Sequence, residues 1–426
     1  MFRPENAQSL VGVALTLGIC WALSEDKKRF PWRLALGAIA LQAGLVALIF
    51  GLPAARAVIH GINGAVDGLA AATATGTQFV FGYMAGGAQP YSVENPNALF
   101  VFAFQVLPVI LVISALSALL WHWRVLKWII RGFGFVFEKT MGMGGASATA
   151  TASNIFLGMV ETPIIIRGYL DKLSRSELFM MMVVGLATVA GSTMVAYATV
   201  LKAVLPNAAA HVLAASVVSA PAGVLLARIM IPEKPNVGGV SVDYTSLLKY
   251  DSAVDAISKG VSDGLMVVLN ISGVLIVYVA FVAIANSLLG WALPDMFGGP
   301  VTIERVLSVV FAPLAWALGI HWEEAFKAGY LLGVKLMLTE FIAFIQLGAI
   351  PAAEMSERTR TILTYALCGF ANVGSVGITV SGMGVLMPER RGEVISLVWK
   401  ALVAGFLATC LTAAVVGVMP NELFSI

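Results

Sequence analysis

The sequence predicts an all-α integral membrane protein with about eight transmembrane helices and two re-entrant helical hairpins, arranged as an inverted repeat. The first observation is composition: 59% of the 426 residues are hydrophobic and 12% are charged, whereas a soluble domain usually carries about 25% charged residues. The second is a set of apolar runs that approach the roughly 20 residues a helical span needs. The third is a pair of glutamates, Glu161 and Glu340, inside apolar, glycine-bearing sequence.

The two glutamates indicate an internal repeat. Each is followed by a similar stretch, Gly-Leu-Ala-Thr-Val-Ala-Gly at 185–191 and Gly-Phe-Ala-Asn-Val-Gly-Ser at 369–375. An ionisable side chain at membrane depth costs on the order of 3 kcal/mol on insertion scales, so it persists mainly where it faces a partner or a watery cavity. Two such units in one chain therefore predict a central polar site between related halves.

Composition also excludes several classes of partner and site. The net charge is +2 and no basic block is long enough to indicate nucleic-acid binding. The three cysteines lie far apart without a CxxC motif, so neither a disulfide framework nor a zinc site is expected. The first apolar stretch precedes its positive cluster, which is the wrong polarity for a cleaved signal peptide.

Residues 1–124 contain three expected spans, at 8–24, 34–52 and 100–121. The loop between the first two is rich in lysine and arginine, so the positive-inside rule places it in the cytoplasm and the N-terminus outside. Residues 54–80 are rich in Gly, Ala and Thr. We expect them to form a helix that lies flat in the membrane interface or packs on a neighbouring subunit.

Residues 125–232 form the expected first repeat. Small polar residues and Pro163 interrupt the stretch 145–172, so it does not resemble a single span. We expect a re-entrant hairpin instead, in which two half-helices meet at a tip. A polar linker at 233–250 follows the repeat. The elements expected in order are an amphipathic helix at 125–138, the hairpin at 145–172, a broken span at 177–204 and a span at 208–231.

The second half repeats this order with the opposite orientation. Three crossings separate the two hairpins, and an odd number inverts the second unit relative to the first. Residues 251–320 contain an interfacial helix at 251–262, a span at 264–289 and an amphipathic helix. The second repeat, 321–426, contains a hairpin at 322–349, a broken span at 358–385 and a last span at 393–418.

The polar residues of the two repeats are the candidate site. Glu161 and Glu340 either contact a ligand or are satisfied structurally by backbone N–H groups at a half-helix end. Asn154 and Thr188 offer an amide and a hydroxyl to a small hard cation, which prefers several oxygen ligands. Their structural alternatives are a helix cap for Asn154 and a bond from Thr188 to its own helix.

Asn372 and Ser375 follow Phe370 in the second broken span. With Glu340 they are suited to grip a polyhydroxyl ligand, since a carboxylate accepts strong hydrogen bonds from hydroxyl groups. Phe370 is suited to pack on a flat ring, and ordinary core packing is its alternative. Catalytic motifs such as HExxH and GxSxG are absent from the sequence, so an enzyme that uses the two glutamates as acid and base is the less favoured alternative.

At these residues the chain resembles the concentrative nucleoside transporter family, and its length is similar to that of the bacterial eight-span members. The resemblance covers nearly the whole chain. It rests on five stretches: Asn-Ile-Phe-x-Gly-x-x-Glu-x-Pro at 154–163, Ser-Glu-Leu-Phe with Gly-Leu-Ala at 176–187, Glu-Phe at 340–341, Cys-Gly-Phe-Ala-Asn at 368–372 and Pro-x-Arg-Arg-Gly at 388–392.

The resemblance implies sodium-coupled symport of nucleosides into the cell, with proton coupling as the alternative. It implies a homotrimer in the bacterial cytoplasmic membrane, each protomer having a scaffold and a mobile transport domain that moves like an elevator. The expected boundaries are scaffold spans with an interfacial helix at 1–124, the first repeat at 125–232, the linker at 233–250, a region with the sixth, scaffold span at 251–320, and the second repeat at 321–426.

The resemblance also implies the roles of individual residues. Glu340, Asn372 and Ser375 would bind the ribose hydroxyls, and Glu161, Phe370 and the tip of the first hairpin would face the nucleobase. Sodium, the only cofactor-like group implied, would lie between the hairpin tip and the broken span, held by the side chains of Asn154 and Thr188 and the carbonyl groups of Leu157 and Val189.

One departure from the family concerns base recognition. Well-known members have Gln-Thr between the hairpin glycine and glutamate, whereas Met159 and Val160 stand there in this chain. Two polar base contacts are therefore lost, and Thr193 is expected to compensate in part. A lost buried hydrogen bond is commonly worth about 1–3 kcal/mol, so the base preference is expected to differ while the sugar contacts are kept.

Overall fold

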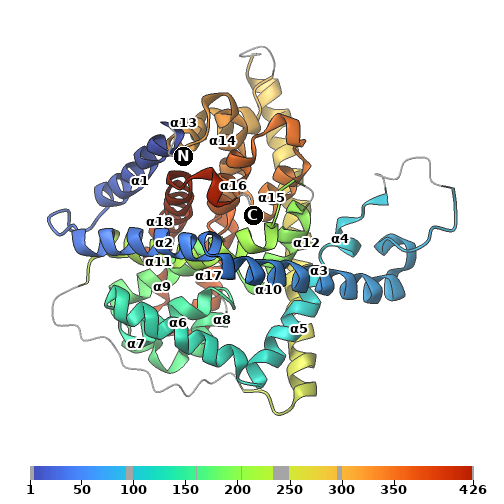
Figure 1. The fold of residues 1–426 in the computed structure, drawn as a ribbon, viewed down its shortest axis with the longest axis horizontal. Helices are drawn as coiled ribbons and strands as arrows, with labels where there is room; N and C mark the ends of the chain where they lie inside the picture. The colour runs from blue at the N-terminus through green and yellow to red at the C-terminus, as the bar shows by residue number, and fades with distance from the viewer. Residues whose placement is uncertain are drawn as a thin grey trace.

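The computed structural model describes residues 4–92, 99–159, 161–202, 204–233, 249–294 and 300–424. Every regular element in these ranges is helical, in agreement with the predicted all-α class (Figure 1). The N-terminal third contains α1 (Pro4–Ala22), α2 (Trp32–Gly51), α3 (Pro53–Phe81), α4 (Phe102–Gln105) and α5 (Val109–His122). The expected helix at 54–80 is therefore present as α3.

The first repeat follows the order expected from its sequence. An amphipathic helix leads into two half-helices that form hairpin 1, then a helix broken at residues 188–190, then a continuous helix. These elements are α6 (Val125–Met141), α7 (Gly145–Asn154), α8 (Glu161–Ile165), α9 (Arg175–Ala187), α10 (Gly191–Leu201) and α11 (Ala208–Met230). Most of the expected linker, residues 234–248, lies outside the described residues.

The second repeat has the same order of elements. Hairpin 2 consists of α14 and α15, and the second broken helix is interrupted at residues 368–372. The amphipathic helix α13 (Ile303–Ala317) precedes the repeat, whose own elements are α14 (Trp322–Met337), α15 (Glu340–Ala349), α16 (Glu357–Leu367), α17 (Val373–Leu386) and α18 (Arg391–Val418). Helices α13 and α14 meet at an angle of 117°, so they do not form one straight span.

Between the repeats the structure differs from the prediction. One helix, α12 (Ala253–Ala292), extends over 40 residues and replaces the separate interfacial helix and span expected at 251–262 and 264–289. Two glycines allow this helix to pack closely against α5. A Cβ at Gly260 would lie 2.6 Å from the Cα of Ala115, and one at Gly264 would lie 3.0 Å from the Cα of Leu111, both in α5.

Six helices of the described residues are long and apolar enough to cross a membrane. Two further expected spans have a different form. Helix α1 begins with a polar turn, Pro-Glu-Asn, and the span expected at 358–385 consists of the two shorter helices α16 and α17. The six lie at Trp32–Gly51, Phe102–His122, Arg175–Leu201, Ala208–Met230, Ala253–Ala292 and Pro388–Val418.

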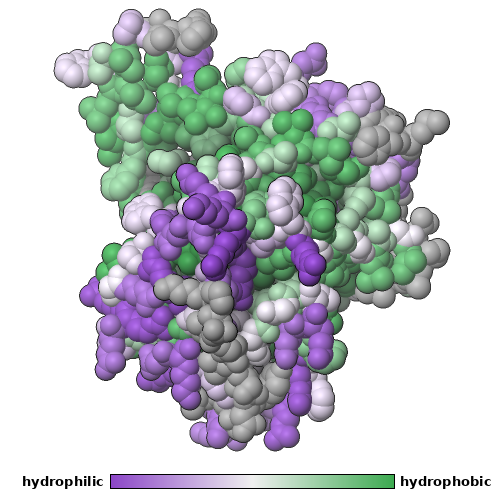
Figure 2. Space-filling view, turned by 90° about the vertical axis from the view of Figure 1, so that its left-hand side faces the viewer, coloured by the Kyte–Doolittle hydropathy of each residue, from purple (hydrophilic) through white to green (hydrophobic). Residues whose placement is uncertain are grey.

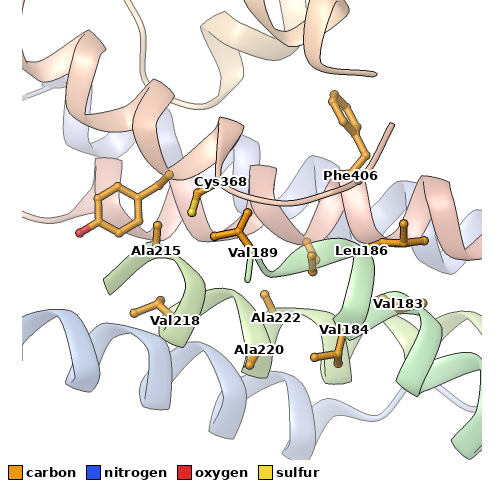
Figure 3. Close-up of a cluster of buried hydrophobic side chains, with 14 of the residues drawn as sticks. Val183, Val184, Leu186, Val189, Ala215, Val218, Ala220, Ala222, Cys368 and Phe406 are labelled. Atoms are coloured by element: carbon orange, nitrogen blue, oxygen red, sulfur yellow. The ribbon is translucent and has the colours of Figure 1, made fainter. Parts of the chain in front are cut away.

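The core lies where the two repeats pack together. Helices α9, α11, α16 and α18 contact one another, and their small and β-branched side chains are almost fully buried. Figure 3 shows this cluster, with residues from the end of α9 facing α11 and Cys368 of the second break close by. A rigid apolar core therefore surrounds both helix breaks and fixes their backbone.

The outer surface is unusually apolar. Figure 2 shows hydrophobic side chains over much of the upper part of one face and hydrophilic side chains gathered toward the lower part. In the apolar window of α12 no residue is buried, and Trp291 is 88% exposed. Part of α3 extends away from the main body (Figure 1), and its Phe79 is 92% exposed. Such surfaces are stable only against lipid or another protein chain.

Candidate functional site

The site is built around the two helix breaks, which contact each other directly. The Phe370 backbone N–H donates a hydrogen bond to the Thr188 carbonyl at 3.3 Å. Gly369 allows this approach, since a Cβ at that position would lie 2.8 Å from the Ala187 carbonyl oxygen. Unwound backbone of this kind supplies free polar groups at membrane depth, where regular helices supply none.

Each hairpin packs against the broken helix of the other repeat. Hairpin 2 places α15 on α10, and hairpin 1 places α8 beside α17. At the tip of hairpin 1, the Thr379 hydroxyl lies 3.7 Å from the Met159 sulfur. This exchange joins each of the two re-entrant elements to a broken helix of the other repeat.

In this region the Glu340 carboxylate accepts hydrogen bonds from two side chains. Glu340 is the first residue of α15, 3% exposed, and both of its oxygens accept hydrogen bonds. Tyr197 of α10 donates to one oxygen at 2.8 Å, and the Asn372 amide donates to the other at 2.8 Å. Side chains from both repeats therefore hold this carboxylate, which is more than the backbone capping that was the structural alternative.

Asn372 is held in a defined orientation. Its Oδ1 accepts the Ser375 backbone N–H at 2.8 Å, which makes it the N-cap of α17. The amide group is thereby turned so that its Nδ2 reaches Glu340. Ser375 is buried in the first turn of α17, and Phe370 is half-buried in the break. The three residues expected to contact ribose, Glu340, Asn372 and Ser375, thus form one hydrogen-bonded cluster.

Glu161 lies at the tip of hairpin 1 as the first residue of α8. It is half-buried, and Gly158, with φ of +87°, makes the turn that precedes it. A Cβ at Gly158 would lie 3.2 Å from the Glu161 carboxylate and 2.9 Å from Ala190, so only glycine fits this tip. Val160, the other expected base contact beside Met159, lies outside the described residues.

The candidate cation residues surround the first break. Asn154 ends α7, is 1% exposed, and neither polar atom of its amide has a hydrogen-bond partner among the described residues. It caps no helix, so its structural alternative does not hold. The Thr188 hydroxyl donates to the carbonyls of Val184 at 2.9 Å and Asn154 at 3.1 Å, so bonding to its own helix, as in its alternative, does occur.

Backbone groups complete this side of the site. The Ser216 hydroxyl of α11 lies 3.4 Å from both the N–H and the carbonyl of Val189. Gly191 donates its N–H to the Phe156 carbonyl at 2.9 Å, which ties the hairpin tip to the break beside Leu157. A buried amide without partners is costly. A hard monovalent cation would satisfy its oxygen, and the neutral oxygens gathered here fit sodium.

Two residues of this region were not among the candidate site residues predicted from the sequence. Tyr197 contacts Glu340, and it lies one helical turn beyond Thr193, whose hydroxyl donates to the Ala190 carbonyl at 2.9 Å. Lys335 of α14 is fully buried near the second break. A hydroxyl or an ammonium inside an apolar helix needs a partner, and that signal was present in the sequence for both residues.

Comparison with known proteins identifies the family. Three family models match the chain: "Na+ dependent nucleoside transporter C-terminus" at residues 211–417, "Na+ dependent nucleoside transporter N-terminus" at 11–84 and "Nucleoside recognition" at 103–204. The nucleoside permease NupC of Helicobacter pylori is 33% identical, with 96% of each chain covered. The chain belongs to the concentrative nucleoside transporter family.

More distant relatives and solved structures agree with this assignment. The rat sodium/nucleoside cotransporter 1 is 30% identical over 98% of this chain and 64% of its own length. A structure of CNTnw in an inward-facing, substrate-bound state has a TM-score of 0.88 and 32% identity, with 97% of each chain covered. The predicted fold class and family are thus confirmed, and these relatives are transporters and permeases rather than enzymes.

Proposed function

We propose that the protein is a sodium-coupled symporter that carries nucleosides into the cell across the bacterial cytoplasmic membrane. The observation that carries the proposal is the contact between the two helix breaks. One break holds Glu340 and Asn372 in a cluster suited to hydroxyl groups, and the other holds the unpartnered amide of Asn154. A single backbone hydrogen bond joins them.

The sugar part of the substrate is assigned to hairpin 2 and the second break. Ribose hydroxyls would donate to Glu340 and accept from Asn372, with Ser375 beside them, since charge-assisted bonds give both strength and orientation. Tyr197 would hold the carboxylate during binding. The nucleobase is assigned to the other side, between Phe370 and the tip of hairpin 1.

The part of the site assigned to the nucleobase contains one charged side chain and several less polar side chains. Glu161 would accept from a base N–H or hydroxyl group, while Met159, Val160 and Thr193 would shape the rest of the contact. A thioether is a soft and adaptable surface. We therefore expect base selectivity to be weaker than sugar selectivity.

Sodium is assigned to the first break. The ligands would be the side-chain oxygens of Asn154 and Thr188 and the carbonyl oxygens of Leu157 and Val189. Support comes from the unpartnered Asn154 amide and from the family model, whose description is a sodium-dependent transporter. An ion here would lie against the break whose Thr188 carbonyl accepts a hydrogen bond from the Phe370 N–H.

Transport is assigned to an elevator movement within a homotrimer. We propose a scaffold from residues 1–124 and α12, with the repeats at 125–232 and 321–426 as the moving domain, joined by the linker at 233–250. CNTnw, the structural relative, has been solved in inward-facing, outward-facing and intermediate states. The exposed apolar faces of α3 and α12 are suited to lipid and to a second and third copy of the chain.

The direction across the membrane follows from charge. The loop after α1 carries Lys27, Lys28, Arg29 and Arg33, and it pairs with the Arg175 end of α9 through Glu25. We place this end in the cytoplasm and the N-terminus outside. The base of hairpin 1 then faces the cytoplasm.

Proton coupling is the second candidate. The group that takes up the proton would be Glu161 or Glu340, the carboxylates that begin α8 and α15. Nucleoside uptake into proteoliposomes, driven separately by a sodium gradient and by a pH gradient, distinguishes the two. We expect uptake with sodium at constant pH. Uptake driven only by the pH gradient would overturn sodium coupling, and no uptake of any nucleoside would overturn the transport assignment.

A further inference from the structure

Lys335 is a charged side chain with no part in the site described above. It lies in the last turn of α14, the first arm of hairpin 2, and is 0% exposed. An ionisable group at this depth is costly and marks function by default. Among the ion pairs of the described residues, none includes Lys335.

Neutral groups surround its ammonium instead. The Nζ donates to the Ala366 carbonyl at 2.7 Å and to the Thr409 hydroxyl at 2.6 Å. The ring of Phe406 lies 5.4 Å from it, at a distance suited to a cation–π contact. A carbonyl, a hydroxyl and an aromatic face are also the kind of neutral groups that hold a bound monovalent cation.

The position of this ammonium corresponds to that of the candidate sodium site. In the first repeat, Asn154 ends the first arm of hairpin 1, and its carbonyl accepts the hydroxyl of Thr188, the first residue of the break, at 3.1 Å. A Cβ added at Gly185, in the last turn of α9, would lie 3.5 Å from the Asn154 Oδ1. In the second repeat, Lys335 near the end of the first arm meets Ala366 in the last turn of α16, just before the break. The following long helix contributes a hydroxyl in both repeats: Ser216 of α11 contacts the Val189 backbone in the first break, and Thr409 of α18 accepts from the Lys335 ammonium.

We propose that the Lys335 ammonium is a built-in cation, which takes in the second repeat the place that the coupling cation takes in the first. This inference rests on the proposed function and deepens it. The ammonium neutralises the carbonyl end of α16, where the helix dipole is negative, and bonds α14 to α16 and α18. Lys335 is therefore a positioning residue for the break that carries Asn372.

One consequence concerns stoichiometry. If the covalently attached Lys335 ammonium is the cation of the second repeat, only the first repeat needs to bind an ion from solution. The protein then takes one coupling cation for each nucleoside. A short polar side chain at position 335 would leave the Ala366 carbonyl and the Thr409 hydroxyl free, and so would open a second cation site.

The test uses the full-length protein in proteoliposomes, with nucleoside uptake measured over a range of sodium concentrations. Two variants are compared with wild type: Lys335→Met, which removes the charge at similar length, and Lys335→Asn, which copies the amide of Asn154. The matched control is Lys327→Met, since Lys327 lies on the same helix but is exposed and pairs with Glu354 at 2.8 Å.

Lys335→Met is expected to raise the nucleoside KM by roughly tenfold or more at saturating sodium, because the buried carbonyl and hydroxyl lose their partner. Lys335→Asn is expected to raise the Hill coefficient for sodium from about 1 to about 2, the limit set by the number of sites. The control is expected to keep both values. A merely structural lysine would change stability without making the sodium curve steeper.

Wild-type KM and an unchanged sodium curve in both Lys335 variants would overturn the inference. If neither variant folds, Thr409→Val decides, because it removes one acceptor of the ammonium and keeps the shape of the side chain. We expect it to raise the nucleoside KM about threefold or more, as for one lost hydrogen bond, and a wild-type KM would overturn the inference. A failure of the proposed function would give a different result from a failure of this inference, because the wild-type protein itself would then show no sodium-stimulated uptake.

Discussion

Tyr197 and Glu340 lie 143 positions apart in the chain, and the Tyr197 hydroxyl donates a hydrogen bond to the Glu340 carboxylate at 2.8 Å. The bond connects the two repeats, from α10 to the start of α15. Tyr197 also stacks on Phe344, with ring centroids 4.6 Å apart, so its hydroxyl has little freedom to turn away. The carboxylate proposed to bind ribose is thus oriented before any ligand arrives.

Removing this bond should weaken substrate binding. In Tyr197→Phe the ring still packs, but Glu340 loses one of its two side-chain donors, a loss of about 1–3 kcal/mol. We expect the nucleoside Kd to rise by about tenfold, measured by calorimetry with saturating sodium. Tyr365→Phe is the control, because Tyr365 is equally buried but contacts His211 instead. Equal effects of both variants would contradict the role given to Tyr197.

Glu340 itself should be essential for the substrate. Glu340→Ala removes the acceptor and leaves the Asn372 amide and the Tyr197 hydroxyl without their shared partner. We expect no detectable nucleoside binding by calorimetry, while the exposed Glu354→Ala binds normally. Retained binding in Glu340→Ala would be decisive evidence against the ribose assignment.

Asn154 should determine the response to sodium. Asn154→Leu replaces the unpartnered amide with an apolar group of similar size, so the protein keeps its packing and loses an oxygen ligand. We expect sodium to stop raising nucleoside uptake and to stop raising the thermal unfolding temperature, since a ligand that binds the native state stabilises it. Asn270→Leu, on the exposed face of α12, is the control. Full sodium stimulation in Asn154→Leu would remove this residue from the ion site.

Gly369 should be intolerant of a side chain. A Cβ there would lie 2.6 Å from the Thr409 Cγ2 and 2.8 Å from the Ala187 carbonyl oxygen, so Gly369→Ala must push the two breaks apart. We expect a destabilisation of about 1–3 kcal/mol, as for overpacking, and a loss of sodium-stimulated binding. At Gly377 in α17 nothing lies within 4 Å of an added Cβ. Gly377→Ala should therefore be neutral or stabilising; equal melting temperatures for the two variants would refute the packing argument.

Glu25 should make stability depend on pH. Partial burial alone would raise the pKa of its carboxyl, but hydrogen bonds and charge attraction from Lys400 and Arg175 outweigh it and hold that pKa below its usual range. A lowered folded pKa stabilises the protein above the unfolded value, about 4.3, and the gain is lost as pH falls through the folded pKa. Glu25→Gln should therefore melt below wild type at pH 7.

The same comparison at low pH provides the check. Below a pH of about 4 the wild-type carboxyl is increasingly protonated, so the difference in melting temperature between wild type and Glu25→Gln should shrink. A difference between wild type and Glu25→Gln that stays constant from pH 7 to low pH would show that the ion pairs add no stability.

Much of the fold could be predicted from the sequence because its strongest signals are local. Interrupted hydrophobicity around Glu161 and Glu340 indicated both hairpins, and the odd number of crossings indicated their inversion. The continuity of α12 could not be predicted, because the close packing on α5 at Gly260 and Gly264 that accompanies it is not visible in the sequence. Contacts between distant residues were hidden for the same reason: no local pattern links Tyr197 to Glu340, or Lys335 to Thr409.

The hydrogen bond from the Phe370 N–H to the Thr188 carbonyl has a thermodynamic consequence. One peptide group borders the proposed ion ligands and the other borders the proposed sugar ligands, so a ligand that rigidifies one peptide also restricts the other. Linkage then demands symmetry: if sodium tightens the nucleoside by some factor, the nucleoside must tighten sodium by that same factor. A carrier that has bound only one of the two solutes would bind it weakly, and this weak binding limits the leakage of the ion gradient.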